Sequence, residues 1–522
     1  MPATAAVLAL IVGIIGAGLK PSATDMSSSA TNASVELAFR RAGSANGPEL
    51  PRATVDVREP AFKGQTIHVA AGASLQEALD TARPGDRITL QAGATYEGPF
   101  RLPDKDGSNW IVIASDRLDR LPAGRRVQPS DARNMPKLVA STRSVIVAAP
   151  GAHHYRFDGV EIAPAEGKFF HNLIELGSDR AILTEVPHHI IFDRCYVRGD
   201  PKKGGRRGIA MNGRDIALVN SHLSDFKEVG ADSQAIAGWN GPGPFRIENN
   251  YLEAAGENVM FGGADPAVEG LVPSDIEIRR NHFSKPLRWK IDHRSYEGTP
   301  WAVKNLFELK NARRVLVEGN LLEYNWQHAQ NGFAILFTPR NQEGSAPWSV
   351  VEDVTFRHNV IRHAGAGFNI LGRDDNHPSR QTRAISIQNN LLTDIGSEWG
   401  GNGRLFQLLN GTAGVSIVNN TAERATGGIV FGGDHDPHTT FVFQNNVMPD
   451  NGAGFAGSGT AAGRHSIDRY FPNATITGNV FIGGRPEHYP PGNHFQRDAM
   501  PGAGADTRAL LKTASEVVLW QN

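Results

Sequence analysis

The sequence has almost no cysteine and no excess of charge, and both absences exclude whole classes of protein. Cys195 is the only cysteine among 522 residues, so a disulfide framework and a thiolate metal cluster are excluded. Its neighbours Phe192 and Tyr196 predict a small packed side chain rather than a nucleophile. The chain has 53 basic and 54 acidic residues, a formal net charge of -1. Without a global positive field, we expect no nucleic acid as a partner.

Long apolar runs are also scarce, and the one near the start of the chain determines where in or outside the cell we expect the protein to be. Residues 5–19 are apolar and precede Lys20, which is typical of a signal peptide in length, although residues 1–4 contain no Lys or Arg. We interpret residues 1–20 as a signal peptide, with an uncleaved membrane anchor as the alternative. Export would make the protein either secreted or attached to the cell surface, in an extracellular or periplasmic location. We also expect it to be a monomer.

The next segments indicate where the ordered domain begins. Residues 21–62 are rich in Ser, Ala, Thr and Pro without sustained periodicity, which predicts a linker or arm. From Lys63 the pattern predicts a strand over 67–69, a short helix over 74–83 and a strand over 87–91. Ser74 and Glu77 have the spacing of a capping box. Such a helix would cover the apolar end of a stacked repeat.

Most of the remaining chain repeats one unit, in which alternating β-branched or aromatic residues end in Asn followed by a hydrophobic residue. Successive Asn residues are 26 to 39 positions apart, which fits coils of three short strands joined by variable loops. The column comprises Asn250, Asn281, Asn320, Asn359, Asn390, Asn420, Asn446 and Asn479, with Ser221 and Cys195 at the same place in earlier coils. Stacked amides donate and accept hydrogen bonds, so we predict a structural role.

The first repeat also carries a resemblance. Its order of helix, PGD, strand and AGATYEG resembles the N-terminal cap of pectate-lyase-like right-handed β-helix proteins. The resemblance implies an all-β, single-stranded right-handed parallel β-helix, a solenoid with a short N-terminal capping helix. We expect the solenoid to span residues 63–500, with a C-terminal cap or tail over 501–522.

A solenoid exposes one column of strands, so functional side chains should come from equivalent outward positions. Strand alternation would place one set of apolar residues inside: Phe307, Leu309, Phe333, Ile335, Phe368, Ile370, Phe406 and Leu408. The intervening outward set would be Glu308, Lys310, Asn369, Arg373 and Gln407. This row combines a carboxylate, two cations and two amides, which suits an extended polar polymer.

These residue types suit elimination from an acidic sugar. The reaction needs a base for the C5 proton, a charge that stabilises the carboxylate enolate and help for the departing C4 oxygen. Lys310 is the candidate base, because burial and nearby cations can lower the pKa of a lysine. Arg340 or Arg373 could neutralise the developing anion. The competing interpretation is a surface ion pair between Glu308 and Lys310.

The stretch FELKNARRVLVEGNLLEYN, residues 307–325, resembles the catalytic coil of the chondroitinase B and alginate lyase family. In that family a Lys acts as base, an Arg on the next coil assists, and carboxylates with an Asn hold calcium. Lys310 matches the Lys. On the next coil this chain has Thr338, Pro339 and Arg340, and a spaced pair of carboxylates is not recognisable before Lys310. We therefore assign no metal ligand and leave calcium open.

Other residues fit a carbohydrate groove or a different reaction. Trp239 and Trp326 are in predicted loops and could stack on sugar rings or pack against the solenoid. Asp232 with Asp374 or Asp375 could serve as acid and base in hydrolysis. We expect an exported carbohydrate-active β-helix whose partner is a polysaccharide, and a lyase acting on an acidic polysaccharide as its function. The alternatives are a glycoside hydrolase of the same fold and a non-catalytic glycan-binding or adhesive β-helix.

Overall fold

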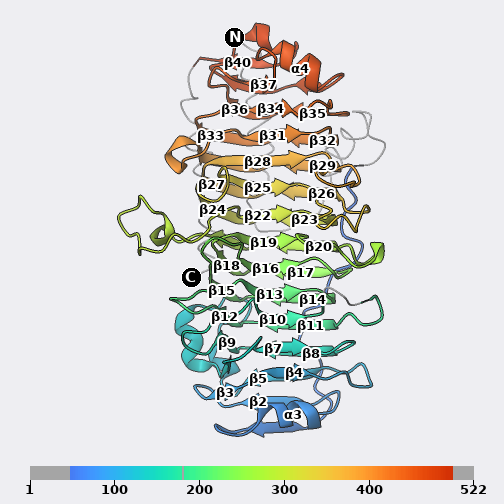
Figure 1. The fold of residues 1–522 in the computed structure, drawn as a ribbon, viewed down its shortest axis with the longest axis vertical. Helices are drawn as coiled ribbons and strands as arrows, with labels where there is room; N and C mark the ends of the chain where they lie inside the picture. The colour runs from blue at the N-terminus through green and yellow to red at the C-terminus, as the bar shows by residue number, and fades with distance from the viewer. Residues whose placement is uncertain (1–46, 179–181, 498–522) are drawn as a thin grey trace, which may run out of the picture.

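The chain winds into a right-handed parallel β-helix in the computed structural model, which describes residues 47–178 and 182–497 (Figure 1). Most coils contribute one strand to each of three long parallel sheets, and equivalent strands of successive coils pair in register. The fold predicted from the repeats is confirmed. Segments 26 to 39 residues apart in the chain therefore lie side by side along the solenoid.

Sheet 1 contains β1 (Thr66–Val69), β2 (Arg87–Leu90), β5 (Ile111–Ser115), β8 (His153–Asp158), β11 (His188–Asp193), β14 (Arg214–Val219), β17 (Phe245–Glu248), β20 (Ser274–Arg279), β23 (Ala312–Glu318), β26 (Val351–Arg357), β29 (Arg383–Gln388), β32 (Ala413–Val418), β35 (Val442–Gln444) and β38 (Thr475–Thr477). Sheet 2 contains β3 (Thr95–Glu97), β6 (Lys137–Ala140), β9 (Glu161–Pro164), β12 (Tyr196–Arg198), β15 (His222–Phe226), β18 (Tyr251–Ala254), β21 (His282–Ser284), β24 (Leu321–Asn325), β27 (Val360–Ala364), β30 (Leu391–Ile395), β33 (Thr421–Ala425), β36 (Val447–Pro449), β39 (Val480–Ile482) and β40 (His494–Gln496). Sheet 3 contains β4 (Phe100–Leu102), β7 (Ile146–Ala148), β10 (Asn172–Leu176), β13 (Arg207–Met211), β16 (Gln234–Gly238), β19 (Glu257–Phe261), β22 (Phe307–Leu309), β25 (Phe333–Phe337), β28 (Ala366–Leu371), β31 (Phe406–Leu409), β34 (Val430–Gly433) and β37 (Phe455–Gly457).

Helices lie at the two ends of the described solenoid. At the first coil, α3 (Leu75–Thr81) buries Leu75 and Leu79 against β1 and β4, and Ser74 Oγ accepts a hydrogen bond from Glu77 N at 3.1 Å. The predicted capping helix is thus confirmed, with slightly shorter bounds. At the other end α4 (Arg464–Tyr470) packs against β34 and β37. Short 3₁₀ helices are η1 (Leu118–Arg120), η2 (Pro129–Asn134), η3 (Glu269–Leu271), η4 (Leu287–Trp289), η5 (Ser397–Trp399) and η6 (Pro486–His488).

The Asn column forms a buried ladder of hydrogen bonds between coils. Asn320 donates from its backbone N and its Nδ2, both at 2.9 Å, to Asn359 Oδ1, and the same pair of bonds recurs from Asn250 to Asn479. Several preceding residues have positive φ, as at Asn389 and Asn419, where asparagine is tolerated better than most residues. The ladder therefore satisfies the backbone of a sharp turn in each coil, as the sequence predicted.

Earlier coils continue the ladder with smaller side chains. Ser221 N donates to Asn250 Oδ1 at 2.8 Å, and Cys195 N donates to Ser221 Oγ at 3.0 Å. Cys195 is fully buried, and burial raises the pKa of its thiol to about 12. The prediction of a packed, unreactive cysteine is confirmed.

Residues 47–62, here called the strap, run along the outer face of sheet 1. The strap passes from Asp353, whose carboxylate accepts from the backbone of Glu49, towards β17 and β8. There Arg246 and Arg156 donate to the carbonyl oxygens of Val55 and Val57 at 3.0 and 2.9 Å. The strap is the described part of the segment expected to be a linker or arm. The expected signal segment and the 501–522 tail lie outside the described residues, within which no helix is long and apolar enough to cross a bilayer.

The ladder predicts a specific loss of stability. Asn359→Ala removes the acceptor for Asn320 and the donors to Val317 O and Asn390 Oδ1. Leaving these buried groups unpaired should lower the free energy of unfolding by about 1–3 kcal/mol. The matched control is Asn376→Ala, because Asn376 is exposed. Equal denaturation midpoints for the two variants would contradict a structural role for the ladder.

Candidate functional site

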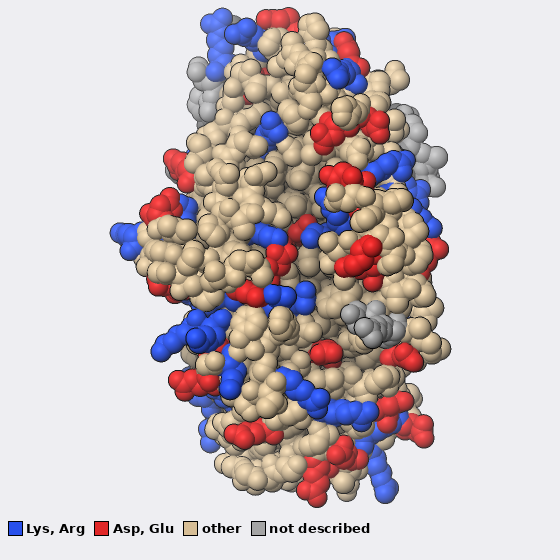
Figure 2. Space-filling model, in the orientation of Figure 1, with Lys and Arg blue, Asp and Glu red and all other residues tan. Residues whose placement is uncertain are grey.

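The outward face of sheet 3 aligns the polar row that the sequence predicted. Glu308 on β22 pairs with Leu336 on β25, Leu336 pairs with Asn369 on β28, and Asn369 pairs with Gln407 on β31. The middle of this face carries clustered acidic and basic atoms, between loops that bulge on either side (Figure 2). Register therefore brings residues from four coils into one strip on the outer face, in which Glu308 and Leu336 are buried and Asn369 and Gln407 are half-buried.

Lys310 and Glu308 form the centre of the site. Lys310 Nζ lies 3.8 Å from Glu308 Oε1, and their side chains are 16% and 2% exposed. Glu308 also accepts hydrogen bonds from Asn305 Nδ2 at 3.0 Å and from Thr338 Oγ1 at 3.4 Å. The carboxylate is thus fixed beneath the ammonium group, and Lys310 is the member of the pair that a ligand can reach.

The protonation of Lys310 differs from the sequence-based expectation. The negative charge of Glu308 raises the pKa of Lys310, and this effect outweighs burial, which acts in the opposite direction. The expected lowering of this pKa is therefore wrong, because acidic neighbours dominate over the nearby Arg340 cation. At neutral pH the resting side chain is an ammonium ion.

Glu257, which the sequence analysis did not select, lies in the same cluster. It is fully buried, accepts from Gln234 Nε2 at 2.7 Å and lies 4.0 Å from Lys304 Nζ. Burial raises the pKa of Glu257 to about 7, and the charges of Glu308 and Asp232 act in the same direction. A carboxyl group that is half protonated at neutral pH can donate or accept a proton.

Strict alternation hid Glu257 because the side-chain direction reverses where β19 begins, at the buried Asn258 and Val259, as it does at the matching place before β22. Leu306 and Phe307 are consecutive but both belong to the core, so the side-chain direction reverses between them. Asn305 consequently reaches Glu308 on the outside. Phe333, predicted to point inward, instead packs with Leu336 and Ala366 in a separate cluster. The signal that could have found Glu257 is its acidic side chain, followed by Asn258, at the start of a strand that ends in three apolar residues.

Trp239 and Lys310 flank a position without a side chain. In sheet 3, Phe261 pairs with Gly238 on one side and with Leu309 on the other. The residues that follow these three, which are Gly262, Trp239 and Lys310, are therefore neighbours across three coils. Gly262 has φ +100°, and a Cβ there would come within 2.7 Å of the Lys310 Cβ. The half-buried Trp239 ring also faces the Arg207 guanidinium at 5.1 Å. The backbone of Gly262 therefore packs closely against Lys310, and the Trp239 ring lies on the coil on the other side of Gly262.

The amide end of the row is also assembled. Gln407 Nε2 donates to Asn369 Oδ1 at 3.0 Å, and Arg404 Nη1 donates to Gln407 Oε1 at 2.5 Å. Asn369 and Gln407 are half-buried, so they remain accessible from the surface.

The two predicted arginines take different positions. Arg340 binds both Asp374 and Asp375, and although its burial acts to lower its pKa, these carboxylates raise it overall. Arg373 is exposed, and its guanidinium has no hydrogen-bond or ion-pair partner among the described residues. Asp232 binds Lys304 rather than joining Asp374 or Asp375, so the acid and base pair considered for hydrolysis is not assembled from these residues.

Trp326 does not offer its ring to a ligand. It is 3% exposed and packs with Trp289 and Trp301 beside the solenoid. The expectation of a substrate-stacking role for Trp326 is therefore wrong, because the loops that carry these three rings bury them against one another.

Oxygen atoms near the centre provide the donor types that calcium prefers. Glu257 Oε1 and Asn305 Oδ1 are buried without a hydrogen-bond partner in the described structure. Glu308 interacts with both residues, since it accepts a hydrogen bond from Asn305 Nδ2 and its charge raises the pKa of Glu257. Carboxylate and amide oxygens suit a hard divalent cation. Among the described residues, however, no third carboxylate joins Glu257 and Glu308 in a group that could hold a metal ion, so this cluster does not fit calcium. Lys304 and Lys310 already place two ammonium groups in this cluster.

Comparisons with known proteins support the fold. No family model and no curated protein matches the chain. A mannuronic acid specific polysaccharide family 6 lyase from human gut microbiota is 12% identical, with 86% of this chain and 95% of that chain covered and a TM-score of 0.51. This likeness is to the solenoid architecture.

Two further solved structures are more distant. The PL6 family alginate lyase AlyGC is 13% identical, with 85% of this chain and 56% of that chain covered and a TM-score of 0.43. A tailspike protein mutant of E. coli bacteriophage HK620, in complex with a pentasaccharide, is 10% identical, with coverage of 81% and 62% and a TM-score of 0.43. The chain thus spans less than two thirds of either protein.

The raised pKa of Glu257 predicts how stability changes with pH. Its folded-state pKa of about 7 exceeds the ordinary value of 4.5 for a glutamate, so the folded state binds this proton more tightly than the unfolded state. The contribution is fully present below pH 4.5 and is lost as pH rises through about 7. The free energy of unfolding, measured by denaturant titration, should therefore fall less for Glu257→Gln than for wild type as the pH rises from 4.5 to about 7. Glu398→Gln, at an exposed position, should follow the wild-type curve.

Proposed function

We propose that this protein is a carbohydrate-active enzyme that cleaves an acidic polysaccharide by β-elimination on the outer face of sheet 3. The observation that carries the proposal is the reachable Lys310 amine, held by the buried Glu308 carboxylate in the middle of a polar strip that spans several coils. The fold is also that of a solved polysaccharide lyase. Such polymers are encountered outside the cytoplasm, in agreement with the apolar segment at residues 5–19.

The charges of the strip favour a uronate over a neutral sugar. The exposed Arg373 guanidinium, which has no hydrogen-bond or ion-pair partner among the described residues, can neutralise a carboxylate while Lys310 acts as the base. Neutralisation stabilises the enolate that forms when the C5 proton is removed. Asn369 and Gln407 extend the strip and offer amides to hydroxyl groups of neighbouring sugars. Trp239, across Gly262 from Lys310, supplies an aromatic face.

Lys310 carries the proton in the proposed reaction. In its neutral form the amine removes the C5 proton, the electron pair forms the C4–C5 double bond, and the bond from C4 to its glycosidic oxygen breaks. The resulting ammonium then protonates the departing oxygen, which restores the amine. Because Glu308 raises the pKa of Lys310, the neutral form is a minor species at neutral pH. Turnover should consequently increase as the solution becomes more alkaline.

Hydrolysis is the second candidate, and one observation favours it. Glu257 and Glu308 are buried carboxyl groups on adjacent coils, and the charge of Glu308 contributes to the raised pKa of Glu257. A protonated and an ionised carboxyl group in one site are the general acid and the base or nucleophile of glycoside hydrolysis. Hydrolysis would produce saturated sugar ends, whereas elimination leaves an unsaturated end that absorbs in the ultraviolet.

Replacement of Lys310 tests elimination directly. The protein should be screened against alginate, pectate, glycosaminoglycans and neutral polysaccharides, with and without a chelator, by ultraviolet absorbance and by reducing ends. On the substrate that responds, Lys310→Ala should reduce kcat by about 10²- to 10⁴-fold, because a general base contributes this much. Lys168→Ala, on an exposed loop, is the control.

The conservative variant separates a base from a simple positive charge. Lys310→Arg keeps the charge but cannot release a proton near neutral pH, so it should be as inactive as Lys310→Ala. The wild-type kcat/KM should also rise with pH through the alkaline range. Activity retained by Lys310→Arg, or new reducing ends without ultraviolet absorbance, would contradict proton abstraction by Lys310.

The amide end of the strip should affect binding more than chemistry. Asn369→Ala and Gln407→Ala each remove a group that can hydrogen-bond to the substrate. Each loss should weaken substrate binding by about 1 kcal/mol, which raises KM about fivefold and leaves kcat little changed. The effect should fade on oligosaccharides too short to reach β31. A fall in kcat with unchanged KM would place these residues in the reaction itself, contrary to this assignment.

A further inference from the structure

Four histidines lie together on the outer face of sheet 1, on a different sheet from the Lys310 strip. His153 and His154 begin β8, and His188 and His189 begin β11, with His188 paired to His153 in the register. The same His–His pair therefore occurs in two successive coils. The following coil has Arg214 and Asp215 at the equivalent positions.

The backbone turns both rings of each pair towards the same side. His154 and His189 have φ of 59° and 55°, so neighbouring side chains do not alternate as they would in a regular strand. Nδ1 of His153 lies 2.7 Å from Nδ1 of His154, and Nδ1 of His188 lies 2.8 Å from Nδ1 of His189. The nitrogen atoms of each pair consequently face one another.

Stacking then brings the two pairs together. The His153 and His188 ring centroids are 4.7 Å apart, and the His154 and His189 centroids are 4.4 Å apart, with interplanar angles of 7° and 15°. One nitrogen each from His154, His188 and His189 lies within 4.8 Å of the others. Aromatic stacking alone explains the spacing along the solenoid, but it does not require ring nitrogens of adjacent residues to converge.

The surroundings suit neutral imidazole ligands and remain open to solvent. Burial lowers the pKa of His154 to about 4 and, together with the charge of Arg214, that of His188 to about 3. All four histidines are only partly buried. Asp104 lies 3.6 Å from His153 Nε2, the ring nitrogen that faces away from His154, and Asp215 lies 3.6 Å from His189 Nδ1, the nitrogen that also faces His188.

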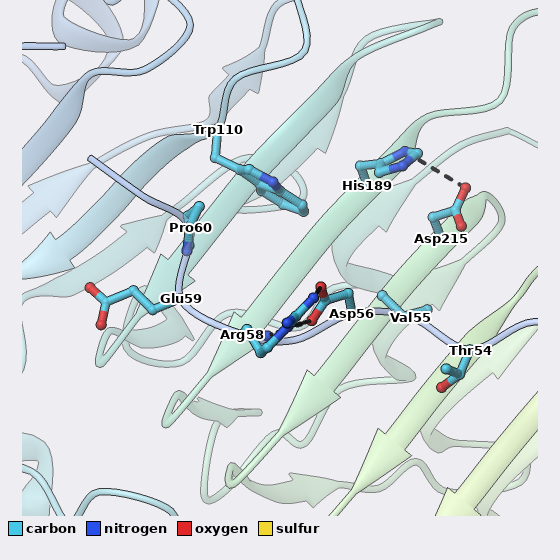
Figure 3. Close-up of a pocket in the computed structure, with 9 residues that line it drawn as sticks. All are labelled: Thr54, Val55, Asp56, Arg58, Glu59, Pro60, Trp110, His189 and Asp215. Carbon is cyan, nitrogen blue, oxygen red and sulfur yellow. Dashed lines mark hydrogen bonds and ion pairs between the residues drawn. The ribbon is translucent and has the colours of Figure 1, made fainter. Parts of the chain in front are cut away.

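A cavity of about 480 Å³ lies beside these rings, between the strap and sheet 1. His189, Asp215 and Trp110 line it from the solenoid, and Asp56 lines it from the strap (Figure 3). Figure 3 shows the His189 ring turned towards Asp215. An ion could therefore reach the histidines from the surface.

We propose that His154, His188 and His189, with His153 beside them, bind one divalent late first-row transition-metal ion such as zinc, nickel or copper. Imidazole nitrogen is a preferred ligand of these ions, whereas calcium and magnesium prefer oxygen. Asp104 can hold the distal nitrogen of His153, as carboxylates do behind metal-bound histidines. The ion would join two successive coils next to the strap, so binding should stabilise the folded chain.

Zinc binding to the purified full chain tests the proposal. Any affinity tag must be removed and the protein stripped with a chelator before titration with Zn²⁺ against a chromophoric competitor. Wild type should bind one ion per chain and unfold at a higher temperature with Zn²⁺ than without it. In the double variant His188→Phe/His189→Phe, the rings can still stack but the nitrogens are lost. We expect its affinity for Zn²⁺ to fall by more than about tenfold.

Two controls make the outcome decisive. His68→Ala/His494→Ala removes two exposed histidines outside the cluster and should bind Zn²⁺ as wild type does. Co²⁺ added to wild type should give visible absorption bands that are absent from the phenylalanine variant. If the phenylalanine variant folds, as judged by circular dichroism, and binds Zn²⁺ with wild-type affinity, or if wild type binds none, the proposal is overturned. The test does not depend on polysaccharide cleavage.

Discussion

The constant register between coils is the constraint on which the molecule depends. Each turn of the ladder commits the backbone N–H of one Asn to the side-chain oxygen of the next, as between Asn320 and Asn359. A shift of one residue would leave these buried groups unpaired and would exchange core and surface positions along the strands. Because register is fixed, residues separated by a whole coil meet at defined places on the outside. The strip through Glu308, Asn369 and Gln407 is a direct consequence.

The chemistry of this strip depends on charges that are costly to bury. Glu257 and Glu308 are almost completely removed from solvent, and their compensation comes from Lys304, Lys310 and neutral amides. Burying paired charges seldom stabilises a protein more than apolar packing would. The proton transfer proposed above would give a reason for burying such charges, because it uses the reachable ammonium group of Lys310.

The outer faces of two sheets carry different features. Sheet 1 is crossed by the strap, which is held by Arg156 and Arg246, and it carries the histidine pairs. The Lys310 strip lies on sheet 3. This separation allows a metal ion near His189 to affect the stability of the early coils without contacting a polymer bound at Lys310. The two proposals can thus fail or succeed independently.

The sequence by itself determined the elements that follow from local, periodic patterns. The capping helix, the coil repeat, the Asn ladder and the adjacency of Glu308 and Lys310 could all be predicted, because each depends on residues a few positions apart or on a repeated motif. Only the tertiary structure decided the rest. The bend at Leu306 and Phe307 turned Asn305 outward, and a matching bend at Asn258 and Val259 did the same for Glu257, against strict alternation. Loop packing buried Trp326, acidic neighbours raised the pKa of Lys310, and register placed His188 on His153. These outcomes depend on contacts between distant parts of the chain, which local patterns do not specify.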